Sequence, residues 1–105
     1  MQSNLKKRIG VDVGRRAKLE DGLAWAAVNE VFYIDIQLDS GANAIEHFDE
    51  ARCETVKGMC QDHDIHLGLH TLSGVNMAEY SNFFRQAADE YLRAYIDMAT
   101  RLDAE

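Results

Sequence analysis

The segment FYIDIQLD, residues 32–39, constrains the fold more than any other feature of this sequence. Its apolar side chains fall on every second position, which predicts a β-strand with one face against a core. Two other segments follow the same pattern, IGVDV at residues 9–13 and HLGLHTL at residues 66–72. The sequence therefore predicts three strands, each with one apolar and one polar face.

The segments between and after these strands have the apolar periodicity of helices. Leu19 and Leu23 begin an apolar stripe in the first interval, a second helix is expected over residues 45–63, and a third from Met77 or Ser81 to Leu102. Asn76 with Glu79 resembles a capping box before the third helix. We expect the large aromatic residues of the helices to pack against the sheet: Trp25, Phe83, Phe84, Tyr91 and Tyr95. The order βαβαβα predicts parallel strands joined by right-handed crossovers.

The polar face of each strand narrows the fold class further. Strands of a parallel sheet that is covered on both faces are nearly continuous apolar runs, whereas these strands carry Asp12, Asp35 and His70. A (β/α)8 TIM barrel explains the difference, because its second face lines the barrel interior, where Asp35, Gln37 and His70 would converge near the carboxyl ends of the strands. Such a barrel needs about 250 residues, so residues 1–105 are expected to form a single partial domain, the first three βα units of an incomplete barrel.

Four segments resemble the N-terminal part of the xylose isomerase-like TIM-barrel family, which contains sugar phosphate isomerases and epimerases and the endonuclease IV type of DNA-repair enzyme. The segments are RIGVDV, YIDIQL, HDIHLGLHTLSGVNMA and YLRAYIDMATRLDAE, in the order of the first strand, second strand, third strand with its loop, and third helix. Asp35 stands where glutamate is more usual in the family, and Asp103 replaces a glycine.

The resemblance implies a division of roles between this chain and a missing remainder. A divalent metal (Mn, Mg, Co or Zn) would be held by carboxylates and a histidine on strands five to eight, so no metal ligand is assigned to this chain. His70 matches a histidine that contacts substrate or acts as an auxiliary acid or base, Asp35 the second-strand acid, and Asn76 a loop asparagine. By position alone, Arg15 lies at the rim and could attract a phosphate or sugar acid.

Each of these assignments has a structural alternative. His70 could be a strand-end histidine bonded to a carboxylate, Asp35 could pair with Arg15 or Arg16, and the arginines could belong to a solvated loop. Neighbouring His66 and His70 cannot share one ion, because four residues of strand span about 13 Å.

The two cysteines, Cys53 and Cys60, lie seven residues apart in a predicted helix. That separation is about 10 Å along the axis, which is beyond disulfide reach. They are expected to be buried thiols.

Charge and composition exclude several partners. A net charge of −7 argues against nucleic acid as a partner. The sequence has no apolar run of about 18 residues to span a membrane, and MQSNLKKRIG lacks the apolar core of a signal peptide. Together these features predict a cytoplasmic protein.

The resemblance thus implies the N-terminal fragment of a metal-dependent sugar or sugar-phosphate isomerase or epimerase, expected to be inactive as 105 residues alone. One alternative is a small α/β module without catalysis that self-associates through its open strand edges. The other is the DNA-repair branch of the family, which the acidic charge disfavours.

Overall fold

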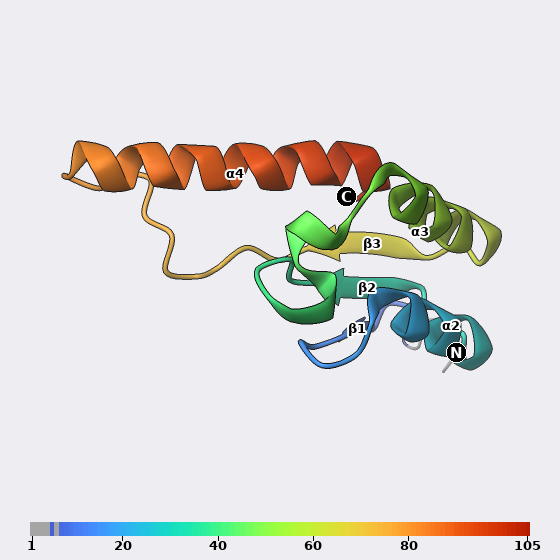
Figure 1. Ribbon diagram of the computed structural model, residues 1–105. Helices are drawn as coiled ribbons and strands as arrows, with labels where there is room; N and C mark the ends of the chain where they lie inside the picture. The colour runs from blue at the N-terminus through green and yellow to red at the C-terminus, as the bar shows by residue number, and fades with distance from the viewer. Residues whose placement is uncertain (1–4, 6) are drawn as a thin grey trace.

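A parallel three-stranded sheet with helices between its strands forms the centre of the molecule (Figure 1). The computed structural model describes residue 5 and residues 7–105. The strands are β1 (Gly10–Asp12), β2 (Tyr33–Ile36) and β3 (His66–Leu69), in the order β1-β2-β3. The helices are α2 (Leu19–Asn29), α3 (Glu50–Asp62) and α4 (Asn82–Leu102). The alternating order and the parallel strands confirm the predicted α/β class.

The register of the strands divides the sheet into two faces. Ile34 lies between Val11 and Leu67, and Asp35 lies between Asp12 and Gly68. Aligned residues of parallel strands point to the same side, so alternate rows are apolar and polar. The apolar rows pack against buried residues of all three helices: Leu19, Leu23, Ala26, Cys53, Val56, Cys60, Tyr95, Met98 and Leu102. The helices therefore cover one face, which we call the covered face.

The second helix begins later than predicted. Residues 45–63 were expected to be helical, but two short 3-10 helices, η1 (Gly41–Asn43) and η2 (Ile45–His47), come first and α3 starts at Glu50. The side chain of Asp49 accepts a hydrogen bond from the backbone N–H of Arg52, 2.8 Å away, and so caps the helix at that point.

The start of the third helix also differs from one of the two predicted positions. The helix begins at Asn82 with Ser81 as its N-cap residue, so the capping box at Asn76 was wrong. The Asn76 side chain instead accepts a hydrogen bond from the backbone N–H of Ala78 and closes a local turn.

Only part of α4 packs on the sheet. Tyr95, Met98 and Leu102 are buried in its C-terminal half, whereas its N-terminal half extends past the sheet (Figure 1). Phe83 and Phe84 are 88% and 68% exposed, and Trp25 on α2 is 50% exposed. The predicted packing was therefore wrong for these three aromatic residues. The reason for α4 is length, because 21 helical residues span about 31 Å and four strand residues about 13 Å.

Both cysteines are buried and unpaired, as the helix spacing predicted. Burial raises the pKa of the Cys60 thiol to about 11. Within the described part of the chain, every helix is too short or too polar to cross a membrane.

Candidate functional site

The face of the sheet opposite the helices is polar and carries the candidate site. We call it the open face; its residues are Asp12, Tyr33, Asp35, Gln37, His66, Gly68 and His70. None of these residues is buried, in contrast to the rows on the covered face. A shallow hollow of about 260 Å³ runs over its amino-terminal half. The alternation seen in the sequence therefore produces an accessible polar surface on the sheet.

At the amino-terminal row of the open face, His66 contacts Tyr33 and Glu105, and we call these three residues the histidine clasp. The rings of Tyr33 and His66 stack with centroids 5.0 Å apart. The carboxylate of Glu105 lies 2.6 Å from Nδ1 of His66. The hydrogen bond to Glu105 raises the pKa of His66 above its ordinary value. The clasp thus ties the segment after α4 to β3.

Asp35 occupies the middle row. Its Oδ1 lies 2.9 Å from the position that a Cβ atom on Gly68 would take, so its carboxylate rests over the glycine of the neighbouring strand. A side chain at position 68 would displace that carboxylate. Among the described residues, no ion pair joins Asp35 to Arg15 or Arg16, the pairing that was the structural alternative.

His70 and Gln37 meet at the carboxyl end of the sheet. The backbone N–H of His70 donates to the carbonyl of Ile36 at 2.9 Å, which continues the β2–β3 ladder by one bond. The side-chain Nε2 of Gln37 lies 3.4 Å from Nδ1 of His70, a long hydrogen bond. When the amide N–H donates to Nδ1, the neutral ring carries its proton on Nε2. An exposed Nε2–H can donate to a hydroxyl or carbonyl oxygen of a ligand.

The two other predicted site residues lie in rim loops. Arg15 is exposed in the loop after β1, and its carbonyl lies 3.1 Å from where a Cβ on Gly41 would stand. Gly41 has a φ of 74°, which also favours glycine. Asn76 lines a groove between its loop and α4, together with Phe84. In the described structure, no contact joins Arg15 or Asn76 to His70.

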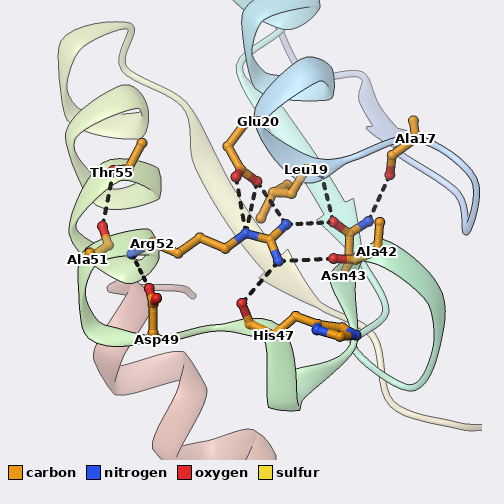
Figure 2. Close-up of polar contacts among 10 residues, drawn as sticks. All are labelled: Ala17, Leu19, Glu20, Ala42, Asn43, His47, Asp49, Ala51, Arg52 and Thr55. Atoms are coloured by element: carbon orange, nitrogen blue, oxygen red, sulfur yellow. Dashed lines mark hydrogen bonds and ion pairs between the residues drawn. The ribbon is translucent and has the colours of Figure 1, made fainter.

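A polar cluster centred on Arg52 joins the start of α2 and the segment at residues 42–47 to α3 (Figure 2). Its guanidinium donates to the Glu20 carboxylate, to the Ala42 carbonyl at 2.9 Å and to Asn43 Oδ1 at 3.1 Å. Burial raises the pKa of Glu20, but the hydrogen bonds and charge of Arg52 outweigh it and the net shift is downward. The Arg52 guanidinium also lies 4.0 Å over the ring of Phe48. These contacts join the first turn of α2 to α3.

Asn43 extends this cluster to the loop before α2. The residue is 1% exposed, and its side chain accepts from the backbone N–H of Leu19 and donates to the carbonyl of Ala17, both at 2.8 Å. It thereby caps α2 from a distant loop, because Lys18 at the N-cap position makes no side-chain cap. Arg52 and Asn43 were not predicted from the sequence, since their side-chain partners lie 5 to 32 residues away in the chain.

Two tyrosines of α4 anchor the carboxyl end of β2. The hydroxyl of Tyr95 accepts from the backbone N–H of Leu38 at 2.8 Å. The hydroxyl of Tyr91 accepts from the backbone N–H of Leu72 and donates to Asp39 at 2.6 Å. Burial and the hydrogen bond to Asp39 raise the pKa of Tyr91. Sequence reasoning assigned both tyrosines to packing alone, although a buried hydroxyl in an apolar stripe requires a polar partner.

The donor groups of this chain do not form a metal site. Among the residues that the structure describes, no three His, Cys, Asp or Glu side chains are grouped so that they could hold an ion. The histidine clasp and the His70–Gln37 pair contain hydrogen-bond contacts of 2.6 Å and 3.4 Å.

Comparisons with known proteins add no relative. No protein-family model matches the chain, and no curated protein matches it. The functional argument therefore rests on the residues and their arrangement.

Proposed function

We propose that this chain forms the first three βα units of a sugar or sugar-phosphate isomerase or epimerase built on a xylose isomerase-like barrel, acting in the cytoplasm. The observation that carries the proposal is the contrast between the two faces of the sheet. Helices cover the apolar rows, while the polar rows stay open and bring Gln37 to His70 at the carboxyl ends of β2 and β3. Barrel enzymes keep their sites at that end of the strands.

The residues after α4 support a continuing sheet. Asp103 adopts a left-handed conformation and ends the helix, and the backbone N–H of Glu105 then donates to the carbonyl of Leu67 at 2.8 Å. In the β2–β3 pair the bond from His66 to Phe32 has the same relation to the register, with residue 66 opposite residue 33. By that rule Glu105 would lie opposite Gly68, and we propose that it begins a fourth parallel strand.

In the complete barrel, the groups on the open face would bind a polyhydroxyl substrate. His70 would donate from Nε2 to a substrate oxygen, with Gln37 fixing the orientation of its ring. Asp35 would accept a hydrogen bond from a substrate hydroxyl, and Arg15 and Asn76 would have to approach by loop movement. The metal that the family uses has no ligand group among the described residues of this chain, so no step is routed through it.

Turnover by the native gene product tests the proposal. The product is purified from its own cells and assayed with aldose–ketose pairs and their phosphates in the presence of Mn²⁺, Mg²⁺, Co²⁺ or Zn²⁺. We expect isomerisation or epimerisation of one pair, and a loss of about 10²-fold or more in kcat/KM for His70→Ala. The 105-residue chain alone should show no turnover.

His63→Ala is the matched control, because His63 is an exposed histidine at the end of α3 and lies outside the open face. Full activity of His63→Ala with loss in His70→Ala supports the proposal. Absence of turnover on every pair, or equal activity of the two variants, contradicts it.

A further inference from the structure

The N-terminal part of α4 projects beyond the sheet and carries exposed aromatic side chains. We call residues 82–90 the overhang; the segment leaves the sheet and ends far from the other helices (Figure 1). Only Ala88 in this segment is half-buried, and all its other residues are exposed. Four large apolar side chains gather in the overhang and just before it: Met77 (77% exposed), Tyr80 (99%), Phe83 (88%) and Phe84 (68%).

The overhang continues the stripe that packs the rest of α4. Phe84 lies 7, 11, 14 and 18 positions before Tyr91, Tyr95, Met98 and Leu102, spacings that place all five on one helix face. The last three are at most 5% exposed, so the same stripe is covered at one end and bare at the other. Phe84, Ala87, Ala88 and Tyr91 form one wall of a groove of about 340 Å³, and the loop at residues 74–76 and 79 forms the other.

We propose that this groove and the overhang bind the overhang of a second copy of the chain, in an antiparallel pair around a twofold axis. The exposed area fits such a pair. Aromatic side chains bury about 150–250 Å² each, so Tyr80, Phe83 and Phe84, scaled by their exposed fractions, offer roughly 400–650 Å², to which Met77 adds. A stable interface takes about 800 Å² from each partner.

The order of residues in the overhang favours the antiparallel arrangement. Ala87 and Ala88 stand between two aromatic residues, Phe84 and Tyr91. When the alanines of two copies face each other, the helix axes approach to about 8 Å. Phe84 of each copy then lies against Tyr91 of the other, so both apolar stripes are covered by the same contact.

The flank of the overhang adds charge complementarity. Arg85 and Asp89 lie one turn apart on one side of the stripe. An antiparallel partner reverses their order, so Arg85 of each copy lies within about one turn of Asp89 of the other. Asp89 also pairs with Arg93 of its own chain at 2.8 Å, so it would be shared between two arginines.

A second copy of the chain is a better partner for the overhang than for the open edges of the sheet. Pairing of β1 with β3 of another copy is heterologous and does not close into a dimer. Pairing of β1 with β1 of another copy would close, but β1 has only 3 residues. Glu105 already bonds to the outer edge of β3. The dimer uses no residue of the open face, but its groove is lined by Asn76, which the proposed function assigns to the substrate.

Sedimentation velocity of the 105-residue chain over a range of concentrations tests the pair. We expect a molecular mass of twice 11.9 kDa as the concentration is raised to about 500 μM. That concentration is above the micromolar Kd that a standard-size interface can reach. The double variant Phe83→Ser/Phe84→Ser should weaken dimerisation at least 100-fold and keep the circular dichroism of the wild type, because both side chains are exposed.

The double variant Val28→Ser/Ile96→Ser is the matched control, as it removes two exposed apolar side chains outside the overhang. It should dimerise like the wild type. Ala87→Cys should form a disulfide between two copies, whereas Ala24→Cys, at an exposed position of α2, should form none. That result would place the antiparallel contact at Ala87. A monomer throughout the range, or a dimer that persists in Phe83→Ser/Phe84→Ser, overturns the proposal; the second result assigns association to another surface.

Discussion

The two faces of the sheet are made by alternate residues of the same strands, yet they differ in every physical property. On the covered face, Ile34, Ile36 and Leu67 are at most 2% exposed and lie among side chains from three helices. On the open face, Asp35, Gln37 and His70 keep contact with solvent, and Gln37 lies within hydrogen-bond distance of His70. Stability is concentrated on one face, and the polar chemistry on the other.

The largest difference in the free energy of unfolding is expected between variants of two neighbouring residues, Ile36 at the end of β2 and Gln37 directly after it. Ile36→Ala removes a fully buried side chain and should lower the free energy of unfolding by about 2–5 kcal/mol. Gln37→Ala changes the open face and should stay within about 0.5 kcal/mol of the wild type. Urea unfolding measures both. Equal losses in the two variants would mean that the open face is also part of a packed core. If Ile36→Ala does not fold, Ile36→Val replaces it, with an expected loss of about 0.5–1.5 kcal/mol.

The Arg52 cluster should give the next effect, because it joins α2 and α3 on the covered side. Arg52→Met removes hydrogen bonds to Glu20, Ala42 and Asn43 and should cost about 2–3 kcal/mol in the free energy of unfolding. Arg93→Met breaks an exposed pair with Asp89 and should leave that free energy unchanged. A stable Arg52→Met protein would show that the cluster does not hold the rim.

The Arg52 cluster should also respond to acid. The folded-state pKa of Glu20 is below its ordinary value of 4.5, so its contribution is present above that value and is lost as the pH falls through the folded pKa. The difference in stability between the wild type and Arg52→Met should therefore narrow below about pH 4. A difference that stays constant between pH 7 and pH 3 would contradict this role of Glu20.

A smaller loss is expected where α4 meets the carboxyl end of β2. Tyr95→Phe leaves the buried backbone N–H of Leu38 without its acceptor, at a cost of about 1–3 kcal/mol. Tyr80→Phe removes a hydroxyl from a residue that is 99% exposed and should have no effect on thermal unfolding. Similar stabilities of the two variants would argue that the Tyr95 hydroxyl does not anchor the helix.

The smallest effect on stability is expected from the histidine clasp, because the His66 side chain is 38% exposed. NMR titration should give a pKa above the ordinary 6.5 for His66, and Glu105→Gln should return it toward that value. Because the folded pKa is raised, the stabilisation is complete below the ordinary pKa and is lost as the pH rises through the folded pKa. Glu54→Gln, which breaks the Lys57 pair, should not move His66. An unshifted His66 in the wild type would show that the clasp is open in solution.

The strands could be predicted from the sequence because period-two alternation depends only on neighbouring residues. Ile34 and Ile36 identified the covered face of β2 without any knowledge of what lies against it. The starts of the helices were harder, because several residues can serve as caps. Asp49 and Ser81 precede the helices in the structure, whereas Asn76 forms a local turn.

The candidate site was predictable only where it follows strand parity. Gln37 and His70 meet because they end neighbouring strands in register. Arg15 and Asn76 are on loops, whose paths the periodicity does not specify. The exposure of Phe84 escaped prediction for a related reason, since a helical stripe shows which side needs cover but not whether the sheet reaches that far.

The size of the native gene product tests the account most directly, because an open polar face beside a covered apolar one is here interpreted as part of a barrel. An antibody against this chain, used on extracts of the cells that produce it, measures that size. The account predicts a single product of about 250 residues or more. A product of 11.9 kDa would contradict it, and the open face would then belong to a complete small protein rather than to the interior of a barrel.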